Sequence, residues 1–101
     1  MPKIYEYFGL IFHIYTRKEH NPVHVHITYA ETESKVELEY INGKLSDIIF
    51  KKVKGFEQIP ESKQRDAKAF IKKYHADITE KWIQVFVKNM KPKFEVIRKK
   101  V

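Results

Sequence analysis

Three histidines lie within seven residues of the sequence, at His20, His24 and His26. Histidine is the side chain that most readily exchanges protons near neutral pH, and it is also the commonest metal ligand in proteins. Side chains in an extended strand alternate between two faces, so a strand that begins at Val23 would place His24 and His26 on the same face. A turn at Pro22 would fold His20 back toward them.

Three interpretations of this cluster stay open. In the first, His24 and His26 are acid/base groups oriented by His20, as cleavage of RNA through its 2′-hydroxyl would require. In the second, the three imidazoles bind a divalent metal such as zinc and leave one position open for water. In the third, the rings hydrogen-bond the backbone and only fix a turn.

The sequence leaves open whether the chain is an enzyme. The chain has no cysteine, and the residues around the histidines match no known metal motif. If it is an enzyme, a metal-independent endoribonuclease with no cofactor is therefore favoured over a metal-dependent hydrolase.

Cleavage of RNA would also require cations that hold phosphate groups. Arg17 and Lys18 stand just before the histidines, and Arg65, Lys68 and Lys72 follow in a predicted helix. These five residues are the predicted nucleic-acid contacts, provided that the helix and the histidines meet on one face.

The formal net charge of +7 falls entirely in the C-terminal part of the chain. Residues 1–60 carry eight basic and eight acidic side chains, whereas residues 61–101 carry twelve and five. Clustered positive charge attracts polyanions, so RNA, including the ribosome, DNA or an acidic protein are the predicted partners. A lysine-covered helix can also be only a solvated surface.

Short apolar runs, rich in Ile, Val, Tyr and Phe, predict strands at 3–8, 10–16, 23–30, 35–40, 45–53 and 94–97. Residues 31–34 are expected to form one hairpin turn, and Asn42-Gly43 a second, because both of the latter residues tolerate positive φ. His13, within a nearly continuous apolar run, is expected to be a hydrogen-bonded structural residue.

A long helix is expected after Pro60, with Ser62 as its N-cap. Apolar residues recur there at intervals of three and four, from Ala67 to Phe86, which is typical of a helix that lies on a sheet. Trp82 belongs to this stripe and is expected in the core. Pro92 is expected to end the helical region.

These elements predict one α+β domain over residues 1–101, with an antiparallel sheet of four to six strands packed against one long C-terminal helix. The 101 residues, 43% of them hydrophobic, suffice for a single core. The N-terminus lacks the pattern of a secretory signal, and no apolar run is long enough to span a membrane. We therefore expect a cytoplasmic protein without membrane contact.

The segment 19–26 also resembles a family of short bacterial proteins, domain of unknown function 4160. Gly9 before an aromatic strand, the turn 42–45, Trp82 and Pro92 are further counterparts of the family pattern. Members usually carry Pro-Pro before the histidine pair, and Val23 departs from that pattern here. The resemblance implies a toxin component of a toxin-antitoxin pair, with an acidic antitoxin-like protein as a partner. The expected fold is similar in architecture to RelE-type mRNA interferases.

The leading functional prediction combines these observations. It is a toxin-like component of a bacterial toxin-antitoxin-type pair that engages RNA or the translation machinery, with RNA cleavage by histidine acid/base chemistry. The alternatives are a non-enzymatic module that docks an acidic protein through its basic helix, and a small metal-binding protein with the ligands His20, His24 and His26.

Overall fold

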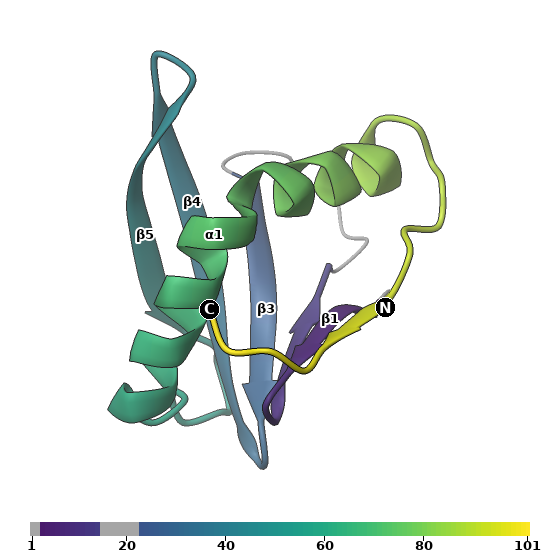
Figure 1. The fold of residues 1–101 in the computed structure, drawn as a ribbon. Coiled ribbons are helices and arrows are strands. Elements are labelled where there is room, and N and C mark those ends of the chain that lie inside the picture. Colours follow the sequence, from purple (N-terminus) through teal and green to yellow (C-terminus); the bar gives the residue numbers. More distant parts are fainter. Residues whose placement is uncertain (1–2, 15–22) are drawn as a thin grey trace.

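The computed structural model describes residues 3–14 and 23–101 of the chain. Within these residues, one long helix crosses one face of a twisted sheet (Figure 1). The elements in chain order are β1 (Lys3–Tyr7), β2 (Leu10–His13), β3 (Val23–Tyr29), β4 (Thr32–Ile41), β5 (Lys44–Lys52), α1 (Glu61–Phe86) and β6 (Glu95–Ile97).

The six described strands form one sheet in the order β5-β4-β3-β2-β1-β6. Neighbours among the first five strands of the chain are antiparallel, whereas β6 pairs parallel with β1, with Tyr5 opposite Glu95. The predicted α+β architecture is confirmed, but the sheet is mixed rather than wholly antiparallel. The chain leaves α1 and returns beside β1 in the same direction, which a crossover connection allows.

The two hairpin turns differ in how well local sequence predicts them. Asn42 and Gly43 have φ values of 54° and 79°, as expected for a tight turn. The first turn instead lies at Ala30 and Glu31, so the expected turn at 31–34 is wrong. Thr32 Oγ1 donates a 2.6 Å hydrogen bond to the carbonyl of Tyr29 and closes the chain there, so β4 begins three residues earlier than predicted.

The helix α1 begins one residue after Pro60, which is its N-cap, and Ser62 lies inside the helix rather than capping it. The carbonyl of Pro60 already accepts a hydrogen bond from Gln64 N at 2.8 Å, so the helical pattern starts before Ser62. The helix ends at Phe86, well before Pro92, and the chain then turns at Asn89 with a φ of 51°.

Aromatic side chains fill the core between α1 and the sheet. The ring of Phe70 lies 4.8 Å from Tyr7, 4.9 Å from Phe12 and 5.1 Å from Tyr5, measured between ring centroids. The Tyr5 hydroxyl donates a hydrogen bond to Asp77 of the helix. Trp82 is buried in the same core, as its helical spacing predicts.

Candidate functional site

The strand β3 places His24 and His26 on one face, as predicted, with ring centroids 6.1 Å apart. Val25 lies between them in the chain and belongs to the buried core. Val25 pairs with Val36 on β4, so the two side chains lie on the same face of the sheet. Leu38 and Tyr40 follow Val36 at intervals of two and share that face, and the Tyr40 hydroxyl contacts the helix. Strand alternation therefore puts the two histidines on the β3 face opposite Val25, and the ring of His24 also lies beside Phe86 at the C-terminal end of α1.

His26 is held by a buried carboxylate. Its Nδ1 lies 3.1 Å from Oε2 of Glu33, and the side chains of His26 and Glu33 are 14% and 7% exposed. Burial lowers the pKa of His26 to about 4, although the hydrogen bond and charge of Glu33 oppose the shift. The imidazole is therefore neutral at pH 7, and it is a weak base.

His24 is only 3% exposed, and its ring centroid lies 6.4 Å from that of Phe86. It stands opposite Glu37, whose carboxylate pairs with Lys51 at 3.1 Å and Lys35 at 3.8 Å. In the part of the chain that the structure describes, Lys35 and Lys51 on the neighbouring strands are thus already paired with a carboxylate. Such burial does not favour acid/base chemistry on a polymer at this pair.

His13 has the structural role expected for it. Its Nε2 lies 3.2 Å from Oγ1 of Thr28 on the neighbouring strand, and burial lowers its pKa. It stands opposite His26 in the ladder, so both rings lie on the same face of the sheet.

The lowered pKa of His26 predicts a loss of stability in acid. Below about pH 6.5 the unfolded chain binds a proton that the folded protein does not, so the free energy of unfolding falls as the pH decreases toward about 4. The lowered pKa of His13 acts in the same direction. We expect a loss of about 2 kcal/mol between about pH 7 and 4.5, measured by urea unfolding.

The matched control is His26→Gln, which cannot titrate and can still donate a hydrogen bond to Glu33. Its stability should fall less steeply than that of the parent protein over the same pH interval. Equal pH dependence in the two proteins would contradict the assignment to His26.

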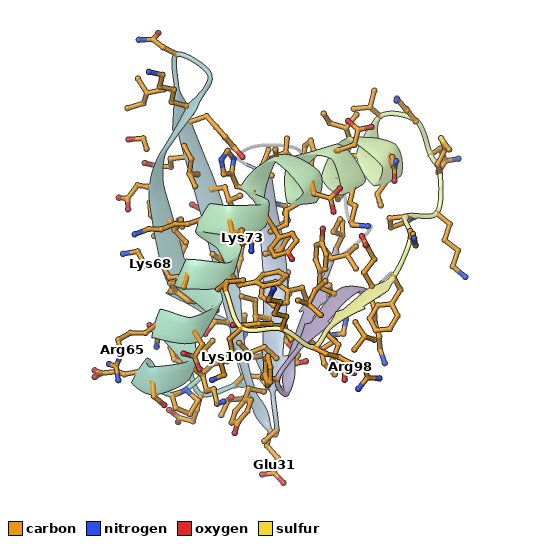
Figure 2. All side chains as sticks on the ribbon, in the orientation of Figure 1. Glu31, Arg65, Lys68, Lys73, Arg98 and Lys100 are labelled. Carbon is orange, nitrogen blue, oxygen red and sulfur yellow. The ribbon has the colours of Figure 1, made fainter. Side chains whose placement is uncertain are left out.

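The predicted phosphate contacts of the helix lie together, away from the histidines. Figure 2 shows Arg65 and Lys68 along the side of α1 that borders β5. Lys72 follows one turn later, and all three side chains are exposed. The structure thus brings these three together on the helix-bearing side of the sheet, where they line two cavities that neither His24 nor His26 lines.

Two adjoining cavities run between α1 and β5, and we call them together the α1–β5 groove. The larger cavity has a volume of about 530 Å³ and the smaller of about 300 Å³, and both include Lys68. The lining residues of the groove are Gly43, Lys44, Leu45, Ser46, Asp47, Ile48, Phe50, Glu61, Gln64, Arg65, Lys68, Lys72 and His75. This is the size range of small-ligand sites.

The sequence prediction missed His75 and Lys44, which both line the groove. The Tyr40 hydroxyl lies 3.1 Å from Nδ1 of His75 and 2.8 Å from Oγ1 of Thr79, which links β4 to α1. Helical spacing was the available signal, because His75 follows Lys72 by three residues and Lys68 by seven, and such residues share a helix face.

The remaining predicted site residues, Arg17, Lys18 and His20, lie outside the described residues. Over 3–14 and 23–101, no group of three or more histidine, aspartate or glutamate side chains could hold a metal ion. The three-histidine metal site of the sequence analysis includes His20 and therefore stays a prediction.

Comparison with known proteins identifies the family. A model for a domain of unknown function, DUF4160, matches residues 9–83, which is most of the chain. The chain belongs to the DUF4160 family. This confirms the resemblance found in the histidine segment. The DUF4160 match includes β3, which we call the histidine strand because it carries His24 and His26, and also the lining of the α1–β5 groove.

No curated protein matches this DUF4160 chain, and no solved structure matches it. In the part of the chain that the structure describes, α1 is too polar to be a membrane-spanning helix.

Proposed function

We propose that this chain is a toxin-like component of a bacterial toxin-antitoxin-type pair, and that it binds RNA, free or within the translation machinery, in the α1–β5 groove. The observation that supports the proposal is that Arg65, Lys68 and Lys72 line this one groove with exposed side chains. Within the described residues, none of the three forms an ion pair with a carboxylate. Their charges are therefore available to phosphate groups.

The spacing of the helix cations fits a single strand of RNA. Arg65 and Lys72 are separated by about 10 Å along the helix axis, so the three cations can follow successive phosphates. Lys44 lies on the other side of the groove, at the start of β5. The half-buried ring of Phe50 also lines it and offers an apolar surface for a base.

The histidine strand is the weaker candidate for RNA. His24 and His26 are largely buried, and the described lysines near them are paired with Glu37. An acidic protein that docks on the basic helix remains the alternative, and it would use the same groove. The experiment must therefore separate these two partners.

Charge removal in the groove should weaken RNA binding selectively. The binding of a fluorescent single-stranded RNA would be measured for the parent protein, Lys68→Gln/Lys72→Gln, and the control Lys91→Gln/Lys99→Gln. Both doubles lose two exposed lysines, but Lys91 and Lys99 do not line the groove. We expect at least a tenfold rise in Kd for the groove variant. The slope of log Kd against log salt concentration should also be shallower by about 1.4 than in the parent protein.

Three outcomes would contradict the proposal. They are no RNA binding by the parent protein, equal weakening in the two doubles, or tighter salt-sensitive binding of polyglutamate than of RNA. The last result would favour the acidic protein partner.

A further inference from the structure

We propose that His75 is the acid/base group of an RNA-cleaving centre in the α1–β5 groove, distinct from the histidine strand. This inference rests on the proposed function, since it assumes that RNA occupies the groove. In this arrangement the phosphate contacts and the proton-transfer group lie in the same groove. The pair His24 and His26 does not line that groove.

The hydrogen bonds of His75 fix its ring. The Tyr40 hydroxyl lies 3.1 Å from Nδ1 of His75 and 2.8 Å from Oγ1 of Thr79, and it donates to the carbonyl of His75 at 3.4 Å. Because its proton has this acceptor, the Tyr40 oxygen can accept a hydrogen bond from Nδ1–H of His75. This arrangement leaves the lone pair on Nε2, so that Nε2 can accept a proton. Tyr40 is therefore a positioning residue that holds the His75 ring in one orientation and tautomer, as a partner on the second ring nitrogen does in other acid/base sites.

The position of Tyr40 itself depends on an irregularity in the sheet. The pairing of β4 with β5 shifts register between Glu39 and Tyr40, close to the turn at Gly43. Irregularities of this kind re-aim a side chain and are common beside active sites. The shift lies at the end of the groove that His75 lines.

The charges around His75 suit a phosphoryl transition state. Lys44, Lys68 and Lys72 line the same 530 Å³ cavity, and their ammonium groups can stabilise the additional negative charge on phosphorus-bound oxygens. Asp47 is the carboxylate on that lining, and one of its oxygens accepts a 2.8 Å hydrogen bond from the backbone of Ile48.

The reaction is an internal transesterification and needs no further reactant. His75 Nε2 removes the proton of a ribose 2′-hydroxyl, and the 2′-oxygen forms a bond to the adjacent phosphorus. The bond from phosphorus to the 5′-oxygen breaks, and the Lys72 ammonium gives that oxygen a proton. The products are a 2′,3′-cyclic phosphate and a 5′-hydroxyl, and the proton on His75 then returns to Lys72 through water.

The test uses the full chain and an end-labelled RNA, with binding and cleavage measured separately. The parent protein should yield fragments that end in 2′,3′-cyclic phosphate, and it should not cut where the scissile ribose lacks its 2′-hydroxyl. His75→Gln should cut at least about 100-fold more slowly and bind RNA within about threefold of the parent protein. The control His24→Gln/His26→Gln should cut at the parent rate.

Tyr40→Phe keeps the aromatic ring but removes the hydroxyl, and it serves as the second variant. It should slow cleavage less than His75→Gln and move the acid limb of the pH–rate profile, which a purely structural role would not do. Circular dichroism would confirm that each variant is folded.

The two proposals fail in different ways. RNA binding by the parent protein without cleavage would overturn the assignment to His75 and leave the proposed function standing. Cleavage that survives in His75→Gln but is lost in His24→Gln/His26→Gln would overturn it in favour of the histidine strand. No RNA binding at all would overturn the proposed function itself.

Discussion

Truncation of Phe70 to alanine is expected to lower the free energy of unfolding by about 3–5 kcal/mol. Its side chain is fully buried, and its ring contacts Tyr5, Tyr7 and Phe12 from the sheet and Tyr74 from its own helix. Removal would leave a cavity where α1 meets β1 and β2, and aromatic neighbours of this size can collapse into it only in part.

Urea unfolding followed by circular dichroism would measure this loss. The control is Lys73→Ala in the next turn of α1, where the side chain is exposed and a change within about 0.5 kcal/mol is expected. A loss for Phe70→Ala no greater than that of the control would mean that α1 is not packed on the sheet as described.

Replacement of Lys81 by methionine is expected to cost about 3 kcal/mol and to loosen the C-terminal strand first. Lys81 is 4% exposed. Its Nζ donates a 2.7 Å hydrogen bond to the carbonyl of Lys93, lies 2.9 Å from Oε2 of Glu95, and sits 5.1 Å from the ring centroid of Tyr5. Methionine fills a similar volume but leaves the Lys93 and Glu95 oxygens without their buried cation.

Hydrogen exchange would distinguish this local effect from a general loss of stability. The amides of β6 should lose protection more than those of β3 and β4 in Lys81→Met. A matched change at an exposed lysine just beyond the end of α1, Lys88→Met, should leave β6 protected. Equal protection of β6 in the parent protein and in Lys81→Met would contradict the role given to Lys81.

Local patterns predicted the elements whose determinants are local. The apolar run at 35–40 predicted most of β4, and Asn42-Gly43 predicted the tight turn between β4 and β5. The turn at Ala30 was missed because alanine gives no turn signal, and a hydroxyl from Thr32 closes it. The parallel pairing of β6 with β1 was missed because it depends on where the chain runs after the helix.

The candidate site was predictable only within single elements. Strand alternation correctly put His24 and His26 on one face, and helical spacing put Arg65, Lys68 and Lys72 on another common surface. Which sheet face the helix covers depends on the register of all the strands, so the separation of these two groups could not be read from either pattern. The pairing of His75 with Tyr40, 35 residues apart, likewise required the fold.

The pairing of β6 beside β1 also determines how the protein would respond to mechanical force. Because the first and last described strands are parallel neighbours, tension applied between Lys3 and Ile97 would pull them past each other lengthwise. Their hydrogen bonds would then share the load and break together rather than one after another. The chain should resist extension from its ends better than its short last strand suggests.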